Sequence, residues 1–288
     1  MFRTKVTKQL NGRRREEVRA LEQLCCAHDH IQEGVLLNTQ EDQPTYFLCY
    51  EEELLVGLAV MYQIGSDAEI CGYVHPDYRR RGLLKKLVAA VIKETEKCGV
   101  EEVRYVMQPH PSQVIEQFVS EGFFVYEYSE YLMEWRYSYE LQSGGNLRIE
   151  KTDEASRQEL ARLLRDAFGM DEAQIQQRID GMAKEQCIYY GAWQKNQLVG
   201  AFAILQGEDS VYVLDFAVDA DYQGRGIGKE MLKELIYAVQ KQAKDSGKEQ
   251  MKIRIQVSSQ NETAFRLYQK NGFQVISQRD YYQVNWKR

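Results

Sequence analysis

The chain has 288 residues, enough for two domains of ordinary size, and its 44% hydrophobic and 28% charged content is typical of a soluble globular protein. A formal net charge of −6 gives no support for nucleic-acid binding, and no apolar run approaches the roughly 18 residues that a membrane span needs. The charged N-terminus lacks the apolar segment of a signal peptide, so we expect a cytoplasmic protein without a membrane partner.

The cysteines and histidines suggest neither a disulfide framework nor a metal site. Cys49, Cys71 and Cys187 lie in apolar, strand-like stretches, so we expect them to be small core residues in a reducing compartment. The run His-Asp-His at residues 28–30 has no further ligands at metal spacing, and we predict no metal site. The basic run at 13–15 is followed by two glutamates and indicates one solvated face of a helix.

The first half of the chain alternates between strand and helix patterns. The predicted strands are residues 2–7, 46–50, 54–62, 69–74 and 100–107, and the predicted helices are 13–26, 83–96 and 112–120. A loop at 75–82, with three consecutive arginines before its glycine, leads into the second of these helices. A pair of aromatic strands is predicted to open at Gly122-Phe123 and to end near Trp135.

The most informative stretch of the second half is residues 211–237. An apolar, β-branched strand ends at Val218, a turn rich in Asp and Gly follows, and apolar residues recur at helical spacing after Glu230. Glycines at 224, 226 and 228 lack a β-carbon, so the loop can turn tightly and a ligand can approach its amides. The amides precede a helix, whose N-terminus favours a phosphate through unpaired N–H groups and its dipole.

The spacing of this loop excludes two common phosphate-binding loops. A P-loop requires Ser or Thr after its lysine, and here Glu230 follows Lys229. The dinucleotide-binding fingerprint requires a third glycine at the position of Lys229. A connection between strand and helix that is merely rich in glycine is the alternative interpretation.

The two halves of the chain repeat one pattern. Residues 77–82 (Asp-Tyr-Arg-Arg-Arg-Gly) match 221–226 (Asp-Tyr-Gln-Gly-Arg-Gly) at an offset of 144, and Gly122-Phe123 match Gly272-Phe273 at an offset of 150. The order of elements is the same in both halves, which indicates tandem copies of one mixed α/β unit. The Ser-Gly-Gly-Asn stretch at 143–146 is the natural linker, and it predicts domains at 1–142 and 146–288.

Two stretches of the second half share the spacing of one known family. A strand precedes the loop Gln223-x-x-Gly226-x-Gly228, and further on Asn261 opens a helix while Tyr268 stands five residues before Phe273. These motifs resemble those of the GNAT family, the acetyl-CoA-dependent N-acetyltransferases. The resemblance extends over nearly the whole chain and implies two tandem GNAT-like domains. Each would be a mostly antiparallel twisted sheet with a central parallel strand pair, flanked by helices.

The resemblance implies that acetyl-CoA is the co-substrate and that an amine attacks its thioester directly in a ternary complex. The Val218 amide is the expected oxyanion donor, and Tyr268 is expected to protonate the leaving thiolate. A helix cap is the alternative role of Asn261, and a core aromatic is that of Tyr268. The expected cofactor-binding residues are Phe216, Ala217, Val218, Gln223, Gly224, Arg225, Gly226, Ile227, Gly228, Lys229, Asn261 and Tyr268.

The general base is less clearly indicated by the sequence. Many relatives carry a Glu on the strand that leads into the Asn, and the matching residue here is Gln256, whose amide is no useful proton acceptor. Asp215 is the nearest carboxylate on the strand before the loop, and it is the candidate base. It can equally be a structural acceptor, with a water chain as the route for the proton. Tyr281 and Tyr282 either line the acceptor pocket or contribute to packing.

The first copy has lost several of the matching residues. Leu84 stands at the position of the glycine at 228, Phe118 at that of the tyrosine at 268, and Pro111 at that of the asparagine at 261. Phenylalanine cannot donate a proton, and proline lacks both a side-chain amide and an N–H. We therefore predict that the first copy is not catalytic. It either binds CoA weakly through the arginines at 79–81 or acts as a packing partner.

The leading hypothesis is an N-acetyltransferase that acetylates a primary amine, with its active site in residues 146–288. The alternative is a non-catalytic protein that binds or senses acyl-CoA, which the missing carboxylate at Gln256 motivates. The acceptor is a small-molecule or a peptide amine, and the sequence does not choose between them.

Overall fold

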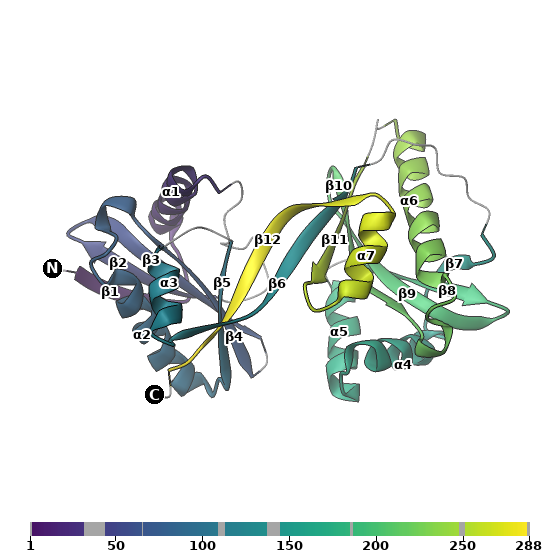
Figure 1. The fold of residues 1–288 in the computed structure, drawn as a ribbon, viewed down its shortest axis with the longest axis horizontal. Coiled ribbons are helices and arrows are strands. Elements are labelled where there is room, and N and C mark those ends of the chain that lie inside the picture. Colours follow the sequence, from purple (N-terminus) through teal and green to yellow (C-terminus); the bar gives the residue numbers. More distant parts are fainter. Residues whose placement is uncertain are drawn as a thin grey trace. The chain divides into compact units, whose positions relative to one another are not determined.

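The computed structural model describes residues 2–31, 44–64, 66–108, 113–136, 145–184, 187–247 and 251–286, and its elements are labelled in Figure 1. The elements of the first half are β1 (Phe2–Thr7), α1 (Gly12–Asp29), β2 (Thr45–Glu51), β3 (Leu54–Ile64), β4 (Asp67–Val74), η1 (Pro76–Tyr78), α2 (Leu83–Cys98), β5 (Glu102–Met107), α3 (Gln113–Ser120) and β6 (Phe124–Trp135). The elements of the second half are β7 (Arg148–Lys151), α4 (Arg157–Phe168), α5 (Glu172–Lys184), β8 (Ile188–Gln194), β9 (Gln197–Gln206), β10 (Ser210–Val218), η2 (Ala220–Tyr222), α6 (Ile227–Asp245), β11 (Lys252–Ser258), α7 (Glu262–Lys270) and β12 (Phe273–Val284).

These bounds agree with the periodicities of the sequence. The helix predicted at 83–96 is α2, and the strand predicted at 54–62 is β3. The helix expected after Glu230 begins three residues earlier, because Gly226 is its N-cap. The mixed α/β class is confirmed.

The chain forms two compact units, each built around one part of a mixed sheet. Unit 1 contains Met1–Glu130 and Gln278–Arg288, and unit 2 contains Tyr131–Ser277. In unit 1 the strand order is β1-β2-β3-β4-β5, followed by the end of β12 and the start of β6. In unit 2 the start of β12 and the end of β6 precede β11-β10-β9-β8-β7. The neighbours β4 and β5 of unit 1 are parallel, as are β10 and β11 of unit 2, whereas β3–β4 and β9–β10 are antiparallel.

Unit 1 buries helices on both faces of its sheet. Alternate residues of β3 face opposite sides, so Ala59 and Met61 pack in the cluster that contains α2, while Leu58 and Val60 pack in the cluster that contains α1. On α2 the buried residues are Leu83, Leu87, Val88, Val91 and Thr95, which recur at the spacing of one helix face.

Unit 2 repeats this arrangement with different helices. Val199 and Phe202 of β9 pack in the cluster that contains α6, while Leu198 and Ala201 pack with α4 and α5. Figure 1 shows α6 and the pair α4–α5 in unit 2. The buried residues of α6 are Ile227, Met231, Leu232, Leu235, Ile236, Val239 and Ala243. Two helix layers therefore hold β10 and its loop in a fixed position.

The prediction of a strand pair at the end of each half is wrong, because each half ends in a single strand. Each pair is one continuous 12-residue strand, β6 in the first half and β12 in the second. A hairpin needs a tight turn, and β6 contains no Gly, Pro, Asn or Asp to supply one. Both strands therefore run from one compact unit into the other, so the units differ from the linear division at 142 and 146. Residues 143 and 144 of the expected linker lie outside the described residues.

Residues from the end of β12 are well anchored in unit 1. The residues Asp280–Gln283 pair antiparallel with Met107–Arg104 of β5. The Ser129 hydroxyl donates to Asp280 over 2.6 Å, and the Tyr281 hydroxyl donates to Glu130 over 2.8 Å. These contacts make residues 278–286 an integral part of the unit 1 sheet.

We expect a fragment of residues 1–142 to be unstable, because it lacks the strand that pairs with β5. Loss of the buried Tyr281 and Val284 alone should cost about 3 kcal/mol or more of unfolding free energy. A matched chimera that joins residues 1–130 to 278–288 through a flexible linker should regain a cooperative transition. Thermal melting followed by circular dichroism compares the two. A fragment 1–142 that melts as cooperatively as the chimera, and at the same temperature, would contradict this assignment.

Candidate active site

The site predicted in the second half lies where β10 and β11 stop pairing. The parallel ladder joins Ser210–Val213 to Lys252–Ile255, and both strands continue beyond it, to Val218 and Ser258. On its other side β10 pairs with β9, and a bulge interrupts that register between Leu214 and Ala217. The ends of β10 and β11 thus present backbone groups that the ladder between them does not use.

The amide of Val218 lies on the β11 side of β10. The Asp219 N–H donates to the carbonyl of Val199 on β9 over 3.0 Å. Because successive backbone groups of an antiparallel strand point to opposite sides, the N–H and C=O of Val218 point away from β9. The Val218 carbonyl accepts a hydrogen bond from the Gln223 side chain over 3.1 Å. This direction is the one that an oxyanion donor at Val218 requires.

The loop between β10 and α6 depends on two glycines in the left-handed region. Gly224 has φ 72° and Gly226 has φ 83°, and a β-carbon at either position would meet open space. Their requirement is therefore conformational, since residues with a β-carbon rarely adopt such φ values. Gly226 is the N-cap of α6, and no side chain of the described residues caps this helix start. The first amides of Ile227, Gly228 and Lys229 are consequently available to an anion.

Gly228 has a different role from the other two glycines. It lies within α6, and a β-carbon there would be 3.3 Å from Leu267, 3.5 Å from Val218 and 3.8 Å from Phe216. The absence of a side chain therefore keeps the first turn of α6 close to β10 and α7.

The polar residues of the loop make local contacts. The Arg225 guanidinium lies over the Tyr222 ring, 5.3 Å from its centroid. Asp219 accepts from the Asp221 N–H over 3.0 Å and from the Arg162 guanidinium over 2.8 Å. These contacts fix the turn that precedes the glycines.

Asn261 is the N-cap of α7, which is the alternative role that we considered for this residue from the sequence. Its side-chain oxygen accepts from the Ala264 N–H over 3.1 Å, and the residue is exposed. A cap of this kind satisfies one of the free amides of the helix. The role of Asn261 in binding a cofactor stays a prediction.

Tyr268 is buried between aromatic rings, with 3% of its surface exposed. Its ring meets Phe216 edge to face at a centroid distance of 6.0 Å and lies 6.0 Å from that of Phe273. Burial raises the pKa of Tyr268, so the hydroxyl keeps its proton at neutral pH. None of the described residues forms a hydrogen bond with this hydroxyl. A protonated phenol without a protein partner, beside the strand before the loop, is suited to give a proton to a ligand.

Asp215 lies in the bulge of β10, with φ 49° and 2% of its side chain exposed. Arg178 of α5 donates to both of its carboxylate oxygens, with Nε at 2.9 and 3.0 Å, and the Tyr189 hydroxyl donates to Oδ2. The hydrogen bond with Asp215 raises the pKa of Arg178, and burial followed by the Asp215 charge raises the pKa of Tyr189. The carboxylate therefore already accepts several hydrogen bonds, which favours the role of structural acceptor.

Sequence reasoning missed the partners of Asp215. Arg178 lies on a helix and Tyr189 on a strand, 37 and 26 positions away, and neither belongs to a motif. Gln256, at the position of the expected base, is exposed on β11. Tyr281 and Tyr282, considered for an acceptor pocket, belong to unit 1, where the Tyr281 ring stacks on Tyr128 at 4.5 Å.

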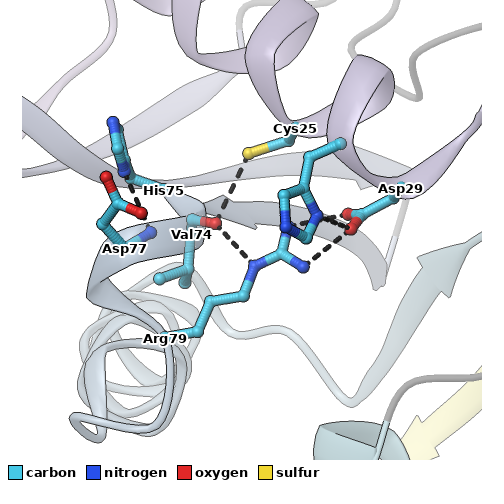
Figure 2. Close-up of polar contacts among 7 residues, drawn as sticks. Cys25, Asp29, Val74, His75, Asp77 and Arg79 are labelled. Carbon is cyan, nitrogen blue, oxygen red and sulfur yellow. Dashed lines mark hydrogen bonds and ion pairs between the residues drawn. The ribbon is translucent and has the colours of Figure 1, made fainter.

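The corresponding loop of unit 1 keeps the backbone of the loop in unit 2. Arg80 and Gly82 have φ 61° and 74°, matching the left-handed glycines at 224 and 226. Arg79 donates to the carbonyl of Val74 over 3.1 Å, just as Gln223 of unit 2 donates to the carbonyl of Val218. Arg79 also makes two hydrogen bonds of 2.7 Å to Asp29 of α1, which Figure 2 shows together with Cys25. This guanidinium is therefore already occupied by an internal carboxylate.

In each unit a residue on the strand faces a residue on the helix, and the large and the small residue occupy opposite positions in the two units. In unit 2 a large residue on the strand, Phe216, faces Gly228 on the helix. In unit 1 the strand has Gly72, and Leu84 on the helix lies 3.6 Å from the position of its absent β-carbon. Leu84 therefore fills the space beside the strand and brings a side chain to the helix start. Phe118 is buried and stacks on a neighbouring phenylalanine, while Pro111 lies outside the described residues.

Within the described ranges, no three His, Cys, Asp or Glu side chains gather as metal ligands. None of the helices in the described part of the chain combines the length and the apolar character that a membrane crossing needs.

Comparisons with known proteins identify the family. The family model described as Acetyltransferase (GNAT) family matches residues 15–115 and 155–273. These ranges lie in both halves and cover most of the chain. The chain therefore belongs to the GNAT family of acetyltransferases, whose members use acetyl-CoA, and it is an acetyl-transferring enzyme with tandem GNAT domains.

Solved structures share the fold over the whole chain. A GCN5-related N-acetyltransferase from Sphaerobacter thermophilus has a TM-score of 0.77 at 13% identity, covering 98% of this chain and 95% of that chain. A tandem GNAT protein from the clavulanic acid biosynthesis pathway has a TM-score of 0.69 at 11% identity, covering 98% of both chains. At these identities the comparison shows the fold alone.

Two curated relatives are more similar in sequence over a shorter region. They are the probable spermine N(1)-acetyltransferase of Bacillus subtilis subsp. natto (strain BEST195) and the spermine/spermidine N(1)-acetyltransferase of Bacillus subtilis (strain 168). Each is 36% identical over 111 residues, which cover 34% of this chain and 68% of the relative.

The opposite placement of the large residue in the two units suggests a test of whether Gly228 is required for acetyl-CoA binding. Gly228→Leu should lower the affinity for acetyl-CoA about ten-fold or more and destabilise unit 2 by about 1–3 kcal/mol through overpacking. Phe216→Gly combined with Gly228→Leu reproduces the arrangement of unit 1 and should recover much of the stability but not the affinity. Calorimetric titration and thermal melting measure the two effects. A double variant that recovers full affinity would show that Gly228 serves packing alone.

Proposed function

We propose that this protein transfers the acetyl group of acetyl-CoA to a primary amine in a ternary complex, with the active site in unit 2. The observation that carries the proposal is the combination of an uncapped helix start after left-handed glycines with the protonated, unpartnered Tyr268. Unit 1 lacks the second part of this combination, since a buried phenylalanine takes the place of the tyrosine.

The residues of unit 2 fit a CoA-type ligand. The uncapped amides at 227–229 suit a diphosphate, and Gly228 leaves the approach to them without a side chain. Lys229 and Arg225 add positive charge beside the loop, and the exposed amide of Asn261 lies at the start of the next helix. The backbone of Phe216, Ala217 and Val218 would align the pantetheine arm. Acetyl-CoA, when bound, supplies the activated acyl group.

The residues of unit 2 supply a proton for the leaving group and a donor for the developing negative charge, and water takes the proton of the amine. The Tyr268 hydroxyl holds a proton that burial keeps in place, and it is the acid for the leaving group. The Val218 N–H, directed away from β9, is the donor for the developing negative charge. Asp215, paired with Arg178 and Tyr189, holds the bulge that presents these groups, so the proton of the amine leaves through water.

The acceptor is an amine, and a polyamine is the first class to examine. The two curated relatives carry spermine or spermidine in their names, and the net charge of −6 favours a cationic acceptor. The test incubates the protein with acetyl-CoA and a panel of polyamines, aminoglycosides, amino acids and peptides, and follows free thiol. Binding of acetyl-CoA without turnover on any amine would favour the alternative, a non-catalytic acyl-CoA-binding protein.

Tyr268→Phe should lower kcat ten-fold or more and leave the affinity for acetyl-CoA within about two-fold, because only the proton donor is removed. The ring packing against Phe216 and Phe273 is kept, so the melting temperature should stay nearly constant. Steady-state rates and equilibrium binding are measured on the same preparations. An unchanged kcat would mean that the leaving group takes its proton elsewhere.

Asp215→Asn separates the two roles considered for this carboxylate. As a structural acceptor, Asp215 should be required mainly for stability, and its replacement should cost about 1–3 kcal/mol by weakening the hydrogen bonds from Arg178 and Tyr189. The kcat of the folded variant should fall less than about ten-fold. A loss of about 100-fold or more in kcat, with unfolding free energy unchanged, would instead identify Asp215 as the base.

A further inference from the structure

The beginning of unit 1 is basic, although the whole chain is acidic. Residues 2–19 contain seven Lys and Arg side chains and two Glu, whereas the chain as a whole has a net charge of −6. Six of these basic residues lie on β1 and on the first turns of α1, and Lys8 lies between the two elements. A local excess of this kind calls for a partner of opposite charge.

Part of this basic segment lines a cavity of about 430 Å³ in unit 1. Its walls come from β1, from the start of α1, from β2 and from the turn between β2 and β3. Pockets for small organic ligands begin at roughly 300 Å³, so this one is large enough for more than a single ion. All of its lining residues belong to unit 1, whereas the glycine loop of the proposed active site belongs to unit 2.

The cavity carries an uncompensated positive charge. Its two carboxylates, Glu17 and Glu53, both bind Arg13, at 2.8 and 3.3 Å. Glu17 also accepts from the Tyr50 hydroxyl over 2.8 Å. The other cationic residues of the lining are Arg3, Lys5 and Arg14, and none of the described residues forms an ion pair with any of them. Three positive charges therefore share this space without a counterion from the described protein.

The start of α1 adds to the same charge. Arg13, Arg14 and Arg15 fill its first turn, which contains no acidic residue. A helix N-terminus is the positive end of the helix dipole, so cations there are unfavourable and an anion is favourable. The arginine charges therefore repel the positive end of the helix dipole, and a bound anion would reduce this repulsion.

Arg3 and Lys5 alternate along β1 and lie on the face of the sheet that α1 covers. The cross-strand partner of Arg3 is Tyr50, which packs in the cluster that contains α1 residues. Thr4 pairs with Cys49, which packs in the cluster that contains α2 residues, so its side chain lies on the other face of the sheet. The cations of β1 and of α1 are therefore gathered on one face.

We propose that this cavity is a binding site for a small phosphorylated anion with at least two negative charges. The planar guanidinium groups of Arg3 and Arg14 match the geometry of phosphate oxygens, and Lys5 supplies a further charge. The site is separate from the loop that takes the diphosphate of CoA, and it gives unit 1 a ligand of its own.

Inorganic pyrophosphate is the probe, titrated calorimetrically at low ionic strength into protein saturated with CoA, so that the loop of unit 2 is filled. Arg3→Gln combined with Arg14→Gln should lower the affinity about ten-fold or more, because two charge-assisted contacts are lost. Arg15→Gln is the matched control, since Arg15 shares the helix turn but does not line the cavity, and it should change the affinity less than about two-fold. Absence of binding to the wild-type protein, or equal losses in both variants, would overturn the proposal.

A carboxylate probe completes the test. Citrate should bind at least about ten-fold more weakly than pyrophosphate, because its carboxylates match the site less well. Citrate that binds as tightly as pyrophosphate would contradict a phosphate site of this design.

Discussion

A constraint on the backbone underlies both halves of this molecule: between a strand and a helix, two residues must adopt positive φ. In unit 2 these residues are Gly224 and Gly226, and in unit 1 they are Arg80 and Gly82. The turn that results places an uncapped helix start beside the end of the strand. Two helix layers on the sheet hold this geometry in place. The chemistry that each unit can perform then depends on which side chains surround an otherwise equal loop.

The two units differ by a small number of side chains with large effects. Unit 2 leaves its helix start clear, with Gly228 against Phe216, and keeps a protonated phenol at Tyr268. In unit 1 the large side chain is on the helix, at Leu84, and Arg79 donates hydrogen bonds to the carboxylate of Asp29. The conserved backbone and the altered surroundings explain how a duplicated domain can keep its fold after its ligand site has changed.

The sequence predicted the local features well because they depend on local physics. Periodicity located α2 and β3 within two residues, and the glycines at 224 and 226 occupy positions that need them. The crossing of β6 and β12 between units was not predicted, although the lack of turn residues within β6 was a visible signal. The partners of Asp215 could not be predicted, since Arg178 reaches it only through the packing of α5 on the sheet. Tertiary contacts of this kind leave no periodic trace in a sequence.

The membership of residues Gln278–Arg288 in unit 1 affects how the protein can be made. A ribosome releases the N-terminal portion first, but the sheet of unit 1 acquires the neighbour of β5 only when the last strand emerges. Until then β5 exposes an open edge, which is a site for pairing with other nascent chains. The order of synthesis and the order of completion are therefore reversed, and the half that is translated first matures last.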